Sequence, residues 1–187
     1  MANRNTQGFG LIPAGTLGST PATAGQGKYK IDAGYGTTIY NGGAVASSAG
    51  YIIEGQGTDT PILGVLNGIF YNAATTLKPT FANFYKQPIT PANSEDIDAF
   101  VFDNPQQQYV VATDDAVAQS GYLETYDMNT SAGSDTTGQS SATLDIGDTS
   151  ADAASFRLLR SAEDPENDEN AARRSVVVCI NLIELQS

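Results

Sequence analysis

Short runs of β-branched and aromatic residues alternate with turn residues along most of this chain of 187 residues. The early runs cover residues 28–31, 37–40, 50–54 and 62–71, with Gly, Asn, Asp or Pro between them. Strands at this spacing are typical of sandwiches and barrels, because each short strand is followed by a turn. The sequence therefore predicts an all-β protein, a jelly-roll-like sandwich or barrel.

One of these runs predicts a central strand. Residues 62–71 are apolar at nearly every position that is not glycine. Such a run is expected to be buried on both faces, and glycines inside it indicate a bulge or a close backbone contact. The later run 176–185 is expected to close the core at the C-terminus. Residues 81–85, bounded by Pro79 and Pro88, are instead expected to form an edge strand or an ordered loop.

Turn residues predict how some strands are joined. Asn41-Gly42-Gly43 lies between two β-type runs and predicts a tight hairpin, because Asn and Gly accept positive φ angles. Residues 98–103 and 109–113 are expected to form a strand, turn, strand unit across Asn104-Pro105. Asp114 is a candidate N-cap for a helical turn over 114–119.

The chain divides into an arm and one domain. Residues 1–27 are rich in glycine and proline with little periodic pattern, which predicts an extended N-terminal arm. Residues 28–187 are expected to form a single β domain. Within it, residues 129–155 are dominated by Ser, Thr, Asp, Ala and Gly and predict a long loop insert, with strands resuming at 156–160.

The side chains available disfavour catalysis. The chain contains no histidine, no tryptophan and one cysteine, Cys179, within an apolar run. Without histidine, general base chemistry near neutral pH would need a strongly shifted carboxylate, lysine or tyrosine. Cys179 is expected to be a buried core residue. We therefore expect no enzyme, no catalytic residue and no cofactor.

Three groups of carboxylates are candidate sites. The acidic segment 163–170 has oxygen ligands that suit calcium, but it lacks the glycine and terminal glutamate of the twelve-residue calcium loop. Asp114 with Asp115, and Asp96 with Asp98, are better explained as turn residues that bond local amides than as a catalytic pair. No metal site is expected. Likewise, Gly8-Phe9-Gly10 lacks the strand and helix context of a phosphate-binding loop.

The net charge restricts the partners. The formal charge is −12, from 21 acidic and 9 basic residues, which repels nucleic-acid phosphates and anionic membrane surfaces. A partner with a basic face is the better expectation. The N-terminus lacks a secretory apolar core, so we expect synthesis in the cytoplasm.

Several short motifs, in order over nearly the whole chain, carry a family resemblance. They are Gly-Phe-Gly-Leu-Ile-Pro at 8–13, Ile-Tyr-Asn-Gly-Gly-Ala-Val at 39–45, Ile-Leu-Gly-Val-Leu at 62–66, Phe-Val-Phe-Asp-Asn-Pro at 100–105 with Tyr-Val-Val at 109–111, Thr-Thr-Gly-Gln-Ser at 136–140 and Val-Val-Val-Cys-Ile-Asn-Leu at 176–182. Together they resemble the capsid decoration, or cement, proteins of tailed bacteriophages. The chain differs from many relatives in its acidity, its lack of His and Trp, and its 129–155 insert.

This resemblance implies a non-enzymatic virion protein on the exterior of an icosahedral capsid. It would bind the major capsid protein, self-associate as a dimer or trimer, and stabilise contacts between capsomers. In this hypothesis the arm bridges capsid subunits through four apolar anchors, Phe9, Leu11, Ile12 and Leu17. The alternative from another class is a carbohydrate-binding or adhesive surface module, which would use exposed Tyr residues and a Thr/Asn-rich face.

Overall fold

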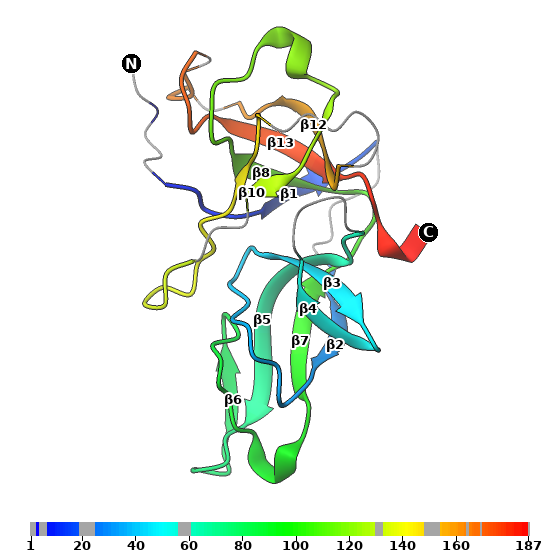
Figure 1. The fold of residues 1–187 in the computed structure, drawn as a ribbon, viewed down its shortest axis with the longest axis vertical. Helices are drawn as coiled ribbons and strands as arrows, with labels where there is room; N and C mark the ends of the chain where they lie inside the picture. Colours follow the sequence, from blue (N-terminus) through cyan, green and yellow to red (C-terminus); the bar gives the residue numbers. More distant parts are fainter. Residues whose placement is uncertain are drawn as a thin grey trace.

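The computed structural model of the protein describes residue 3 and residues 7–18, 25–55, 61–129, 133–147, 154–163, 165–168 and 170–186. Over these residues the protein is all-β, with antiparallel sheets and three short 3-10 helices. The predicted fold class is confirmed at this level, and the sheets are consistent with an all-β sandwich. Figure 1 shows the two main sheets at opposite ends of an elongated molecule, and we call these two parts the first and the second lobe.

The first lobe is built from the N-terminal strand and from the C-terminal half of the chain. Its five-stranded sheet has the order β1-β8-β13-β12-β9. The strands are β1 (Ile12–Thr16), β8 (Gln107–Ala112), β13 (Ser175–Ile180), β12 (Phe156–Ser161) and β9 (Thr125–Tyr126). All six residues of β13 are buried, so this strand lies at the centre of the lobe, as its continuous apolar sequence predicts.

The second lobe comes from one continuous stretch of chain between β1 and β8. Its sheet has the order β2-β7-β5-β3-β4, and β6 pairs with β5 outside this path. The strands are β2 (Gly27–Ile31), β3 (Ala44–Ser48), β4 (Tyr51–Glu54), β5 (Gly64–Asn72), β6 (Pro79–Ala82) and β7 (Ile97–Phe102). Because β2 also comes close to β4, the sheet curls around its own core.

The remaining elements are short. β10 (Met128–Asn129) and β11 (Thr143–Leu144) form a two-stranded sheet beside the first lobe. The 3-10 helices are η1 (Ala92–Ser94), η2 (Gln119–Gly121) and η3 (Glu184–Gln186). The final strand ends at Ile180, and the rest of the expected 176–185 strand is a bend followed by η3.

The buried apolar residues form two clusters. One contains Leu11, Tyr109, Phe156 and Val178 and lies mainly in the first lobe. The other contains Ile31, Ile69 and Val101 and lies in the second lobe. Residues 28–187, expected to form one β domain, therefore contribute to two cores.

β5 is a central strand, as predicted for residues 62–71, but the prediction of burial on both faces is wrong for its C-terminal end, because Phe70 and Tyr71 are only half-buried. It pairs with β3, β6 and β7, and its register against β7 shifts between Leu66 and Gly68. A Cβ at Gly68 would lie 2.9 Å from the Phe81 ring and 3.0 Å from the Ala82 carbonyl oxygen. The predicted bulge and close approach are thus both found at this glycine.

Three expected connections differ from the structure. The Asn41-Gly42-Gly43 turn exists, with Gly42 at φ +76°, but β3 pairs with β4 and β5 and does not form a hairpin with residues 37–40. β7 and β8 do follow one another across Asn104-Pro105, yet they belong to different lobes. Asp114 caps no helix, and its Oδ1 accepts a hydrogen bond from the Ile146 amide at 2.9 Å.

Candidate functional site

The N-terminal segment is anchored to both lobes. In the first lobe β1 pairs with β8, and the Leu11 amide donates a 2.8 Å hydrogen bond to the carbonyl of Gly42, which lies between β2 and β3 of the second lobe. Leu11 is 1% exposed and belongs to the first-lobe core. The structure therefore does not confirm a separate arm over residues 1–27: Ile12–Thr16 form a strand of the protein's own sheet, and Gly27 is the first residue of β2.

The four candidate anchors therefore have different environments. Leu11 is committed to the core, and Phe9 is half-buried. Ile12 is 45% exposed and Leu17 is 36% exposed, at the two ends of β1. The sheet order leaves β1 at an edge, where Pro13 and a register shift between Pro13 and Gly15 disfavour pairing with a further strand. A partner is therefore expected to contact the side chains of Ile12 and Leu17 and not to pair with the backbone of β1.

A second surface lies on the outer face of the second lobe. Three phenylalanines point outward there from neighbouring strands, Phe81 of β6, Phe70 of β5 and Phe100 of β7. Phe81 is 64% exposed, and its ring centroid lies 6.1 Å from that of Phe100. Exposed aromatic side chains grouped on one sheet face are a typical feature of binding surfaces.

An ion-pair cluster adjoins these rings. The Asp98 carboxylate lies 2.7 Å from Lys28 Nζ and 2.6 Å from Lys30 Nζ. Burial acts to raise the pKa of Asp98, but the hydrogen bonds from Lys28 and Lys30 outweigh it and hold that pKa below its usual value. The same contact raises the pKa of Lys30. Both lysines are thereby held on the outer face by one carboxylate.

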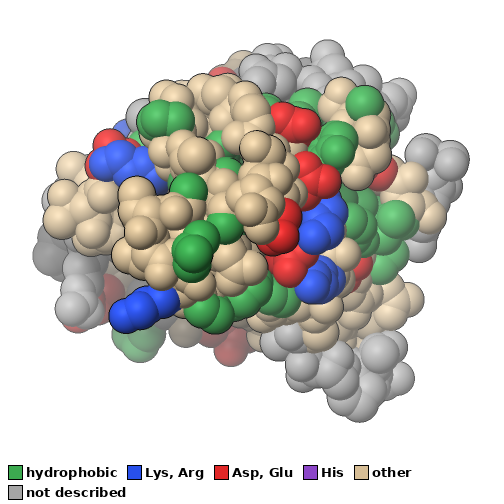
Figure 2. Space-filling model, turned by 90° about the horizontal axis from the view of Figure 1, so that it is seen from below, with side chains coloured by type: hydrophobic (Ala, Val, Ile, Leu, Met, Phe, Trp, Pro, Cys, Tyr) green, Lys and Arg blue, Asp and Glu red, His purple; other side chains and the backbone are tan. Residues whose placement is uncertain are grey.

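A hollow of about 270 Å³ lies beside this cluster, where β5 ends and β7 begins. Charged, amide and aromatic side chains share its lining: Lys30, Phe70, Tyr71, Asn72, Pro91, Glu95, Asp96 and Asp98. Figure 2 views the molecule from the end at which the second lobe lies, and acidic and basic side chains gather there beside hydrophobic ones. We call this site the tip hollow.

Sequence analysis did not identify the tip hollow, because its lining comes from separate segments that the fold brings together. The residues of β7 alternate between inward Ile97 and Ala99 and outward Asp98 and Phe100. This alternation could be recognised in the sequence. It shows which residues face solvent. It does not show that Phe70 and Lys30 are their neighbours, which depends on the strand order β2-β7-β5.

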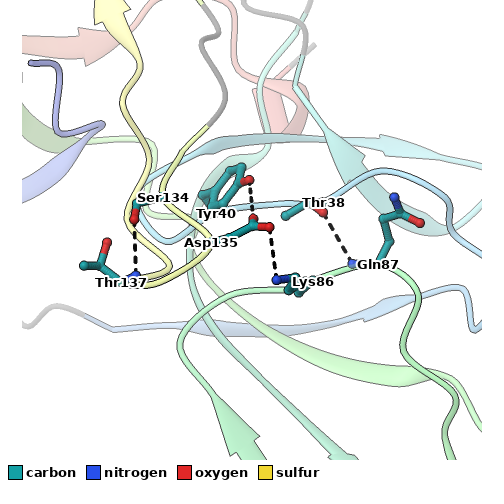
Figure 3. Close-up of polar contacts among 7 residues, drawn as sticks. All are labelled: Thr38, Tyr40, Lys86, Gln87, Ser134, Asp135 and Thr137. Carbon is teal, nitrogen blue, oxygen red and sulfur yellow. Dashed lines mark hydrogen bonds and ion pairs between the residues drawn. The ribbon is translucent and has the colours of Figure 1, made fainter.

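A second polar cluster joins the two lobes. Residues 133–139, which we call the latch loop, lie against the second lobe, and the Tyr40 hydroxyl donates a 2.8 Å hydrogen bond to Asp135 Oδ1. Lys86 Nζ lies 3.0 Å from Asp135 Oδ2, and the Tyr40 ring stacks on Phe84 at 5.7 Å. Figure 3 shows Asp135 between Tyr40 and Lys86.

Hydrogen bonds to Asp135 make its charge favourable in the folded protein. Those from Tyr40 and Lys86 lower the pKa of its carboxyl. The neighbouring contacts in Figure 3 are within each side of this junction, from the Gln87 amide to Thr38 Oγ1 and from the Thr137 amide to Ser134 Oγ. The cluster is a structural contact between lobes.

The candidate chemical groups are placed as follows. Cys179 is free and buried, as expected, and burial raises the pKa of its thiol. Asp98 is paired with lysines, while Asp96 accepts a 3.3 Å hydrogen bond from the Tyr51 hydroxyl.

In the acidic segment 163–170, the Asn3 side chain donates a hydrogen bond to the Asp168 carbonyl and accepts one from the Asp168 amide. Among the described residues, no group of three or more His, Cys, Asp or Glu side chains is arranged to hold a metal ion.

Comparison with known proteins adds no relative. Family models, curated proteins and solved structures were all searched, and none of them matches this chain. Within the part of the chain that the structure describes, no helix has the length and apolar character needed to cross a membrane. The class that the structure defines is an all-β protein with two lobes and two exposed candidate surfaces.

Proposed function

We propose that this protein is a non-enzymatic structural component of a phage virion. It binds the outer surface of the icosahedral capsid and stabilises contacts between neighbouring copies of the major capsid protein, acting as a small homo-oligomer. The motif resemblance over nearly the whole chain motivates this proposal. The single structural observation that supports it is the exposure of Ile12, the first residue of the edge strand β1, and of Leu17, which directly follows that strand.

Fixing the apolar contact residues before binding favours association. Because β1 is already ordered, little conformational entropy is lost when Ile12 and Leu17 are covered by a partner. An interface of standard size buries on the order of 1,600 Å², of which these two side chains would form the apolar centre. The net charge of −12 favours a basic capsid face. Many copies on one shell then stabilise the particle even when each copy binds modestly.

The structure also selects the experiment. Removal of residues 1–27 would take β1 out of its sheet and Leu11 out of the core, so it would test folding as much as binding. Point substitutions avoid this problem. We would measure co-sedimentation of wild-type protein, Ile12→Ser and Leu17→Ser with undecorated capsids of the source phage, and the heat stability of the decorated particles.

The control is Leu123→Ser, because Leu123 is 63% exposed in the first lobe but lies outside β1. We expect saturable wild-type binding that raises the temperature of capsid disruption. Each β1 variant should bind roughly tenfold more weakly, which corresponds to about 1.4 kcal/mol for one apolar contact. Absence of wild-type binding to the capsid would contradict the proposal. Equal losses in the β1 variants and in Leu123→Ser would show that β1 is not the contact.

A further inference from the structure

The tip hollow is distant in the fold from the edge strand proposed for capsid binding. β1 belongs to the first-lobe sheet, whereas the tip hollow is lined by β2, the C-terminal end of β5 and the start of β7, all in the second lobe. In Figure 1 the end of β5 lies at the opposite end of the molecule from β12 and β13. A ligand in the tip hollow would therefore leave β1 free.

The lining of the tip hollow contains charges of both signs. Lys30 is paired with Asp98, and the Glu95 and Asp96 carboxylates also line the hollow. A phosphorylated or otherwise anionic ligand would face the Glu95 and Asp96 carboxylates. A cationic ligand would face three carboxylates and one ammonium group that is already paired with Asp98. The lining therefore disfavours anionic ligands, and a small cation is the competing ligand that the test must exclude.

The same lining suits a ligand whose polar groups both donate and accept hydrogen bonds. The Glu95 and Asp96 carboxylates accept hydrogen bonds, the Lys30 ammonium group donates them, and the Asn72 amide does both. Phe70 and Tyr71 add aromatic surface to this polar set. Aromatic rings with a few convergent polar groups are typical of sites for small uncharged polar molecules. Sugar rings combine apolar C–H faces with hydroxyl groups that both donate and accept.

The tip hollow is also held in shape before any ligand arrives. Ala73 and Pro91 form a β-bridge, and the Ala74 amide donates a 3.2 Å hydrogen bond to the Thr90 carbonyl. Lys30 is fixed by its 2.6 Å contact with Asp98. The volume of about 270 Å³ lies just below the range of roughly 300–1,000 Å³ for small-molecule sites. It suits one or two sugar units, with any further unit of an oligosaccharide outside the hollow.

We propose that the tip hollow binds a neutral saccharide, with Phe70 packing against a sugar ring and Asp96, Glu95, Asn72 and Lys30 bonding its hydroxyl groups. This site is independent of capsid attachment. A protein fixed to a particle through β1 would present it outward on the second lobe.

The test uses the full chain labelled with 15N and a panel of neutral trisaccharides, namely maltotriose, cellotriose, mannotriose and N,N′,N″-triacetylchitotriose. Glucose 6-phosphate and choline serve as the anionic and cationic comparison ligands. We expect at least one trisaccharide to shift the backbone amides of residues 70–72 and 95–98 in a saturable manner. The two charged ligands should leave these amides unchanged.

Two variants and two matched controls locate the site. Phe70→Ala and Asp96→Ala should each weaken binding roughly tenfold. Leu123→Ala removes an exposed apolar side chain from the first lobe, and Asp115→Ala removes an exposed aspartate from the same lobe. Both controls should bind as wild type does. Circular dichroism would verify that all four variants fold.

Three outcomes would overturn the inference. They are no amide shift with any trisaccharide, shifts caused by glucose 6-phosphate or choline instead, and equal weakening in the site variants and the controls. None of these results bears on capsid co-sedimentation, which is measured on wild type and β1 variants. Failure of the saccharide site and failure of the capsid proposal are therefore separable.

Discussion

At the scale of single residues, a substitution of Tyr109 tests one of the contacts that join the two lobes. Its side chain is fully buried in β8, and its hydroxyl donates a 3.0 Å hydrogen bond to the carbonyl of Phe102, the last residue of β7. Tyr109→Phe keeps the ring but leaves this buried carbonyl without that donor. We expect a loss of about 1–3 kcal/mol in the free energy of unfolding, measured by urea denaturation.

Tyr126→Phe is the matched control for this prediction. The Tyr126 hydroxyl donates a 3.0 Å hydrogen bond to the Gly121 carbonyl, but that hydrogen bond is only partly buried. Water can replace the lost donor there, so the loss of stability should be smaller. A Tyr109→Phe protein as stable as the control would show that the Phe102 carbonyl finds another partner.

At the scale of elements, the N-terminal segment is held by close backbone contact around Gly10. Gly10 has φ +71°, and a Cβ at this position would lie 2.7 Å from the Gly42 carbonyl oxygen. Gly10→Ala therefore combines backbone strain with a steric clash and should destabilise the protein by more than about 1 kcal/mol. Thermal unfolding followed by circular dichroism measures the change.

Gly15→Ala provides the comparison within β1. A Cβ at Gly15 would have Gln108 Oε1 at 3.9 Å as its nearest neighbour, which is an ordinary contact. Its effect on the unfolding temperature should be small. If Gly10→Ala unfolded at the wild-type temperature, the N-terminal segment would not depend on this contact.

The elements also show what the sequence could predict. β5 and β13 were predictable as strands because a continuous apolar run defines a strand without reference to its neighbours, but only β13 is buried along its whole length. The Asn41-Gly42-Gly43 turn was predictable as a turn, but its strands were not, because Gly42 packs against Leu11 and residue 39 bridges to Tyr85. The tip hollow depends on pairing between strands distant in sequence, and no local pattern encodes that.

At the scale of the whole molecule, the two lobes separate two binding roles. The first lobe contains β1 with its exposed apolar residues, and the second contains the tip hollow. Because β7 and β8 are consecutive in the chain but lie in different lobes, a short connection with the Tyr109 contact fixes one junction. The latch loop provides another, through Asp135. The relative position of the two surfaces therefore depends on these contacts.

At low pH the latch loop should be held less tightly against the second lobe. Because hydrogen bonds lower the pKa of Asp135 in the folded protein, its stabilising effect is present above the unfolded-state pKa of about 4 and is lost as pH falls through the lower folded-state value. Asp135→Asn mimics the protonated carboxyl. At pH 7 the variant should exchange the amide hydrogens of Asn41 and Ser140 faster than wild type, by less than about tenfold, because the ion pair is exposed.

Well below pH 4 the two proteins should exchange these amides at the same rate, since wild-type Asp135 is then neutral as well. Asp115→Asn, at an exposed aspartate of the first lobe, is the control for a general effect of charge. The Asn41 amide bonds to the Gly138 carbonyl and the Ser140 amide to the Asn41 carbonyl, so both report directly on the junction. A difference between Asp135→Asn and wild type that persisted in acid would mean that the Asp135 charge does not hold the lobes together.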